Sequence, residues 1–185
     1  MNRAFSACLF MVLTAHAALA QSPWSGVLSA GYATGVDNGD LSSGSFAVTG
    51  GVFRQIGRIT ALGIDVGYQQ YENQTEPNLI DFGSLKTTRS AGHVAGVLRL
   101  RSSVGRWRPY AVGGLGVYVL RETIQEVTDD FLAPGAQAGI GVEFHPNGGA
   151  FGVGLGTRFH VAATVHDGEL EGAGILGVML SLAYH

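Results

Sequence analysis

The chain has 185 residues, including 29 glycines and one cysteine, and its formal net charge is −3. Only 14% of the residues are charged, against about 25% in ordinary soluble domains. One cysteine excludes a disulfide framework, the net negative charge excludes a basic surface for nucleic acid, and 46% hydrophobic residues exclude a disordered chain.

The first 20 residues have the three-part pattern of a secretory signal peptide. Arg3 gives a positive start, the stretch 4–15 is apolar, and small residues alternate just before Gln21. This apolar stretch is shorter than the roughly 20 residues that a membrane-spanning helix needs. We therefore expect a signal peptide at 1–20, whose cleavage removes the one cysteine, and a single exported domain at 21–185.

Large apolar residues alternate with small residues along the rest of the chain, which is the period of a β-strand with two different faces. In one segment Leu62, Ile64 and Val66 share a face, while Gly63 and Asp65 share the other. Eight such segments are predicted as strands, an even number, as in bacterial barrels. In chain order they are 24–36, 44–56, 59–71, 88–101, 107–121, 133–144, 150–163 and 172–184.

The connections between these strands alternate in length. The short ones are 57–58, 102–106 and 145–149, and the mostly longer ones, which contain most of the acidic residues, are 37–43, 72–87, 122–132 and 164–171. Short periplasmic turns and longer external loops are typical of a transmembrane barrel whose two ends lie in the periplasm. We expect the long connections to be external, mobile loops.

The composition of the second strand face indicates which face points outward. A soluble barrel would carry many charged and hydroxyl side chains on its exterior, whereas here the face opposite the large apolar residues is mainly Gly and Ala. Small side chains fit the narrow interior of eight strands. The sequence therefore predicts an all-β fold, an eight-stranded antiparallel up-and-down transmembrane β-barrel in the bacterial outer membrane, with a soluble ligand-binding barrel as a weaker alternative.

Aromatic residues are predicted to form two girdles at the membrane interfaces. The set expected at the periplasmic strand ends, pointing outward, is Trp24, Tyr110, Phe144, Phe151 and Tyr184. The set expected at the external strand ends is Tyr32, Phe46, Tyr68, Tyr118 and Phe159. Members of the two sets are often eight residues apart, which is about 20 Å of height in a strand tilted by roughly 40°.

A few charged or titratable residues fall on the inward face: Asp65, His93, Arg99, Arg101, Glu143 and Arg158. Buried charges cost free energy unless they are paired. We predict a lumen charge cluster of Asp65, Arg99, Glu143 and Arg158, with Glu143 paired to Arg99 near the periplasmic end. A structural plug is favoured over a gate for a narrow ion path, because eight strands leave little open bore.

Two segments carry a resemblance to a known family. The stretch 108–118, Arg-Pro-Tyr-Ala-Val-Gly-Gly-Leu-Gly-Val-Tyr, and the closing strand 174–184 resemble the small outer-membrane β-barrel superfamily, like the OmpA transmembrane domain, OmpX and OmpW. The resemblance implies contact with outer-membrane lipids and insertion by the barrel-assembly machinery. The closing strand of that family usually ends in Phe or Trp, whereas this chain ends in Tyr184 and His185.

No catalytic, cofactor-binding or metal site is predicted. The glycine run 152–156 lacks the frame of a phosphate loop and is interpreted as space for interior side chains. His160, His166 and Asp167 are near one another in sequence, but their spacing is unspecific for metal. No Ser stands two residues after His160, as in outer-membrane lipid A deacylases, and neither G-x-S-x-G nor H-E-x-x-H occurs.

Two classes of function remain open. We favour a non-enzymatic structural or surface-interaction role through the external loops, with an unspecified external ligand. The alternative is a narrow channel or transport barrel for small solutes.

Overall fold

The computed structural model describes residues 23–37, 40–78, 83–102, 104–124, 127–146, 149–166 and 169–185. The predicted signal peptide lies outside these ranges. Within them, no helix has the length and apolar character needed to cross a membrane.

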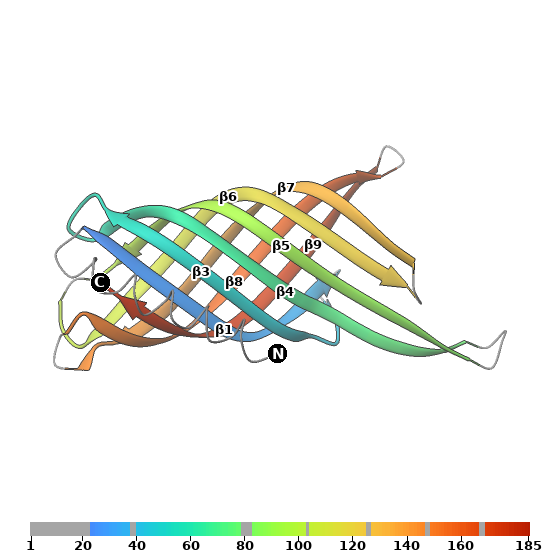
Figure 1. Ribbon diagram of the computed structural model, residues 1–185, viewed down its shortest axis with the longest axis horizontal. Coiled ribbons are helices and arrows are strands. Elements are labelled where there is room, and N and C mark those ends of the chain that lie inside the picture. The colour runs from blue at the N-terminus through green and yellow to red at the C-terminus, as the bar shows by residue number, and fades with distance from the viewer. Residues whose placement is uncertain are drawn as a thin grey trace, which may run out of the picture.

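The described residues form nine β-strands in one sheet. They are β1 Trp24–Asp37, β2 Asp40–Leu41, β3 Ser45–Gln55, β4 Thr60–Asn78, β5 Gly83–Arg101, β6 Trp107–Ile124, β7 Val127–Phe144, β8 Phe151–His166 and β9 Glu169–Tyr184. The two-residue strand β2 pairs only with the end of β1. The other eight pair antiparallel in chain order, and β9 returns to pair with β1 (Figure 1). The predicted eight-stranded antiparallel up-and-down barrel is confirmed.

The barrel is closed by antiparallel pairing between β1 and β9 over most of their length. Gly26 of β1 lies opposite Tyr184 of β9, and Val36 lies opposite Gly174. A closed sheet has no free edge, so the backbone hydrogen bonds of a lipid-exposed strand are satisfied by its neighbours.

The two ends of the barrel differ. At one end, which we call the turn end, β3–β4, β5–β6 and β7–β8 are joined by short connections. At the other, the hairpin end, the paired strands run on almost to the tips, with Asn78 opposite Gly83 and Ile124 opposite Val127. The β4–β5 hairpin projects far beyond the barrel body (Figure 1).

The prediction that the long connections are loops is wrong for most of the residues described, although residues 42–44, between β2 and β3, are a loop. Residues 72–78 of β4 continue to pair with residues 83–89 of β5, and residues 122–124 of β6 pair with residues 127–129 of β7. In these segments the sequence no longer alternates between large apolar and small residues, which is why they were not predicted as strands. The backbone ladder nevertheless continues, because its hydrogen bonds do not depend on that alternation.

The outward face of the barrel is apolar. On β4, Leu62, Ile64 and Val66 are 54%, 59% and 51% exposed, whereas the intervening Asp65 is 2% exposed. This arrangement is the reverse of a soluble barrel, which buries its large apolar side chains and exposes polar ones.

The interior is filled by side chains. One buried apolar cluster includes Tyr71, Tyr118, Leu120, Ile175 and Met179 with several alanines. A second consists of Phe53, Ala61, Ala95, Val97 and Val112. Charged and polar side chains occupy the rest of the lumen, and they form the candidate site.

Candidate functional site

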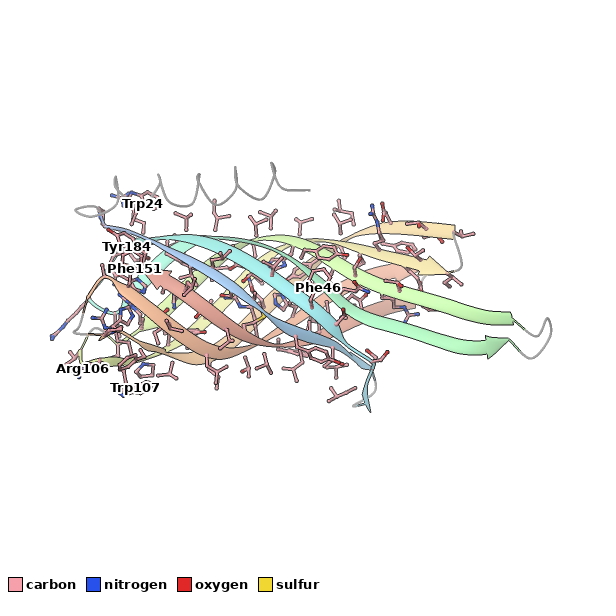
Figure 2. The ribbon with its side chains drawn as sticks, turned by 60° about the horizontal axis from the view of Figure 1, so that its bottom comes forward. Trp24, Phe46, Arg106, Trp107, Phe151 and Tyr184 are labelled. Carbon is pink, nitrogen blue, oxygen red and sulfur yellow. The ribbon has the colours of Figure 1, made fainter. Side chains whose placement is uncertain are left out.

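Most of the predicted girdle residues lie on the outward face of the barrel. Trp24, Tyr32, Phe46, Tyr68, Phe151 and Phe159 are all exposed. Figure 2 shows Trp24, Phe151 and Tyr184 near the turn end and Phe46 further towards the hairpin end. Tyr184 is only 8% exposed and packs against Phe151, with ring centroids 4.9 Å apart.

The prediction that Tyr110 and Tyr118 face lipid is wrong. Tyr118 is completely buried in the lumen, and Tyr110 lies beneath the guanidinium of Arg99, whose Cζ is 4.6 Å from the ring centroid. Their strand, β6, carries apolar residues on both faces, so alternation alone is ambiguous there. The signal that identifies the outward face is Trp107, which is 64% exposed and shares its parity with Leu115, Val117 and Val119.

Trp107 is a girdle residue that the sequence reasoning missed. Its ring contacts Phe144, a predicted girdle residue that is partly buried, at a centroid distance of 4.8 Å. Figure 2 shows Trp107 beside Arg106 at the turn end.

The turn end of the lumen holds what we call the turn-end cluster, formed by Arg99, Arg101, Glu143, His145 and His185. Arg99 donates a hydrogen bond from Nη2 to Oε1 of Glu143, the pair predicted from the sequence. The other carboxylate oxygen, Oε2, lies 3.3 Å from Nε2 of His145 and 3.2 Å from Nε2 of His185. Nη1 of Arg101 lies 3.7 Å from the same oxygen. Glu143 and His145 are completely buried.

Glycines make room for this cluster. On β8, a Cβ at position 152 would lie 2.5 Å from Nε2 of His145, and one at 154 would lie 3.2 Å from Cγ of Glu143. A Cβ at 156 would collide with the hydroxyl of Tyr110. The alternating glycines of β8 therefore provide space for interior side chains, as interpreted from the sequence.

His185 follows the last strand and its ring is shielded at the mouth of the barrel. Burial lowers the pKa of His185 to about 4, and the positive charge of Arg101 acts in the same direction, although contact with Glu143 opposes both. The His185 imidazole is therefore neutral at neutral pH.

The middle of the lumen holds what we call the mid-lumen cluster, formed by Asp65, Gln69, His93, Tyr118, Arg158 and His160. Asp65 accepts hydrogen bonds from Arg158 at 2.9 Å and from His93 at 2.8 Å. His160 contacts Gln69 at 2.9 Å and the Tyr118 hydroxyl at 3.0 Å through its two ring nitrogens. The predicted cluster residues thus form two separate ion pairs instead of one group.

A small cavity separates these two clusters. A cavity of about 10 Å³, lined by Ser29, Phe53, Arg99, Tyr110 and Arg158 among others, lies between them. This volume is at the lower limit for one water molecule.

Of His160, His166 and Asp167, whose spacing is unspecific for metal, the structure describes only the side chain of His160. His160 points into the mid-lumen cluster, where both of its ring nitrogens have partners. The side chain of His166 and all of Asp167 lie outside the described residues.

The two ends of the barrel carry opposite charge. Nine acidic residues belong to the described strands of the hairpin end, namely Asp37, Asp40, Glu72, Glu76, Glu122, Asp129, Asp130, Glu169 and Glu171, against three basic ones, Lys86, Arg89 and Arg121. Two ion pairs between adjacent strands, Arg89–Glu122 and Arg121–Asp130, use part of this charge. At the turn end the described residues include Arg54, Arg58, Arg106 and Arg108, and Glu143 alone is acidic.

The sequence was compared with models of known protein families and with known proteins. A model of the outer membrane protein beta-barrel domain matches residues 5–181. No curated protein sequence matches the chain.

Solved structures with the same fold include three bacterial outer-membrane proteins. Neisserial surface protein A is 10% identical, with a TM-score of 0.67, covering 88% of this chain and 97% of its own. The N-terminal barrel of Pseudomonas aeruginosa OprF is 10% identical, with a TM-score of 0.52 and coverage of 88% and 98%. Yersinia pestis Ail, solved with the heparin analogue sucrose octasulfate, is 11% identical, with a TM-score of 0.51 and coverage of 87% and 99%.

Proposed function

Because the chain belongs to the outer membrane protein beta-barrel domain family, we propose that it is a non-enzymatic barrel whose hairpin end contacts cationic groups outside the cell. The proposal has three parts: the orientation of the barrel, the charge of its outer surface and a closed lumen. The observation that carries it is the excess of acidic residues at the hairpin end.

The orientation follows from the connections. Bacterial barrels have short turns on the periplasmic side and longer extensions outside. The turn end also contains the start of β1 at Trp24 and the end of β9 at Tyr184. We therefore assign the turn end to the periplasm, where the barrel-assembly machinery would meet the closing strand.

The charge of the hairpin end determines which partner it fits. Nine acidic residues against three basic ones give the described strands of this end a net charge of about −6. A surface of one sign attracts ligands of the opposite sign and repels those of the same sign, and both effects weaken with salt. Sucrose octasulfate, the ligand in the Ail structure, is a polyanion, and we expect this chain to have the opposite preference.

The filled lumen supports an interaction role over transport. Two ion pairs, Arg99–Glu143 and Arg158–Asp65, lie inside the barrel, and the cavity between them is about 10 Å³. Moving solutes through this interior would require breaking buried ion pairs, each at a cost of about 3–5 kcal/mol.

A binding measurement on the folded barrel tests the charge preference. Fluorescent poly-lysine should bind proteoliposomes that contain the protein, with an affinity that falls as salt is added, and heparin should not bind. Replacing Glu72, Glu76 and Asp129 by Gln, Gln and Asn should weaken poly-lysine binding. The matched control replaces Arg54 and Arg58 by Gln at the turn end and should have no such effect. Heparin binding, or equal poly-lysine binding by all variants, would refute the proposal.

Surface labelling tests the orientation separately. An epitope inserted after Asn78, at the tip of the β4–β5 hairpin, should leave the barrel folded, since it interrupts no ladder within the barrel wall. Antibody should then label intact cells. Labelling that requires a broken outer membrane would reverse the assignment of the two ends.

A further inference from the structure

We propose that Glu143, His145 and His185 form a binding site for a divalent transition-metal ion of the zinc class at the turn end of the lumen. This site is separate from the hairpin end and does not depend on the function proposed above. It also goes beyond the sequence, from which no metal site was predicted.

The donor atoms have the spacing that zinc requires. Oε2 of Glu143 is 3.3 Å from Nε2 of His145 and 3.2 Å from Nε2 of His185, and the three atoms all lie within 4.8 Å of one another. Ligands at about 2.0–2.1 Å from a tetrahedral zinc are about 3.3 Å apart. Two of the three edges therefore already match, and the third must shorten by at most about 1.5 Å. Two imidazoles and one carboxylate are a ligand set that zinc uses, with water in the fourth position.

The hydrogen bond on the far side of His145 leaves Nε2 as the ring nitrogen that faces the proposed site. Nδ1 of His145 lies 3.0 Å from the carbonyl oxygen of Gly149. A carbonyl only accepts, so Nδ1 carries the hydrogen, and in the neutral ring Nε2 holds a lone pair. Nε2 faces Oε2 of Glu143 at 3.3 Å, so a metal ion between these two atoms would be bound by both. Metal-bound histidines commonly donate their other ring nitrogen to a backbone carbonyl in this way.

The fold holds the three ligands in place from two sides of β8. The backbone N–H of His145 donates to the carbonyl of Arg106 at 2.7 Å, and that of His185 donates to Ala150 at 3.0 Å. Position 154 of β8 pairs with Glu143 on one side and with Ser181 on the other. Because positions 152 and 154 are glycine, side chains from β7 and from the end of β9 meet above that strand.

The neighbouring arginines limit the affinity without occupying the ligand atoms. Arg99 binds Oε1 of Glu143 and leaves Oε2 to the two imidazoles. Its guanidinium also lies over Phe53 and Tyr110, with Cζ at 5.4 and 4.6 Å from the ring centroids, which partly compensates its charge. Arg101 is 15% exposed and can turn towards water. We therefore expect binding weaker than that of a structural zinc site.

A metal titration of the full chain, folded in detergent micelles and treated with chelator, tests the proposal. Zn²⁺ should bind with one ion per chain in competition with a chromogenic chelator. His145→Ala and His185→Ala should each weaken binding by at least about tenfold, because loss of a ligand costs no less than loss of a supporting hydrogen bond. Gly152→Ala should have the same effect by displacing the His145 ring. The control is His160→Gln, which removes another buried lumen histidine and should leave the affinity unchanged.

X-ray absorption of the zinc-loaded, unmodified protein keeps the test independent of whether the variants fold. The expected zinc environment contains two imidazole nitrogens and a carboxylate oxygen. The proposal would be overturned by a lack of stoichiometric binding or by a zinc environment without two imidazoles. It would also be overturned if folded His145→Ala and His185→Ala bound Zn²⁺ as tightly as the unmodified protein.

Discussion

Replacing Glu143 by Met should destabilise the barrel more than replacing Arg99 by Met, although the two residues form one ion pair. Arg99 is only 5% exposed, so without Glu143 its guanidinium would be left buried. Among the described residues, its Nε and Nη1 have no hydrogen-bond acceptor. A buried charge left uncompensated costs about 3–5 kcal/mol. Without Arg99, Glu143 keeps its contacts with His145, His185 and Arg101 at 3.3, 3.2 and 3.7 Å, so we expect a loss of about 2 kcal/mol.

Urea unfolding in lipid or lysolipid micelles measures these differences. The two tryptophans, Trp24 and Trp107, both lie at the turn end and report unfolding there by fluorescence. The double variant should be more stable than the sum of the single losses predicts, by at least about 1 kcal/mol, as for residues in one network. Strictly additive losses, or a larger loss for Arg99→Met, would refute the description of a coupled buried pair.

The remaining predictions concern lipid contact, packing and the mid-lumen cluster. Val66→Arg should cost about 2–4 kcal/mol in bilayers, with Val66→Leu close to neutral, and equal stability of the two would contradict the outward assignment. Gly152→Ala should destabilise folding, because its Cβ would lie 2.5 Å from His145, whereas nothing lies within 4 Å of a Cβ at Gly26; chemical unfolding of both alanine variants compares them. Tyr118→Phe should lower the free energy of unfolding by about 1 kcal/mol, because it removes the hydrogen bond to His160. Tyr32→Phe, on the outward face, should leave the free energy of unfolding almost unchanged. A larger loss for Tyr32→Phe than for Tyr118→Phe would contradict the inward assignment of Tyr118.

The barrel itself could be predicted because its strongest constraint is local. In β4 and β8 the two faces differ so clearly that alternation alone assigns them, as Val66 beside Asp65 illustrates. The pair Arg99–Glu143 was predictable for a related reason, since two isolated opposite charges on the inward face near one end have few other partners.

What the sequence could not reveal depends on the three-dimensional register. β6 has Leu115 and Val117 on one face and Val112 and Tyr118 on the other, so its outward face is fixed only by its pairing with β5 and β7. The long hairpins continue by backbone pairing where the side-chain pattern has ended.

The three proposed metal ligands were beyond sequence reasoning for a different reason. His185 is 42 residues from Glu143, and the two meet only because the intervening strand β8 carries glycines where it faces them. No spacing in the sequence encodes such a contact across a strand.

Conductance measures the central claim, a closed barrel whose lumen is filled by paired charges, most directly. The purified, unmodified protein should be reconstituted into planar bilayers and recorded at several voltages, with its fold verified in the same preparation. The account predicts no large, steady current, because Arg99–Glu143 and Arg158–Asp65 occupy the lumen on either side of a cavity no larger than one water molecule. Steady porin-like currents from the folded protein would contradict it.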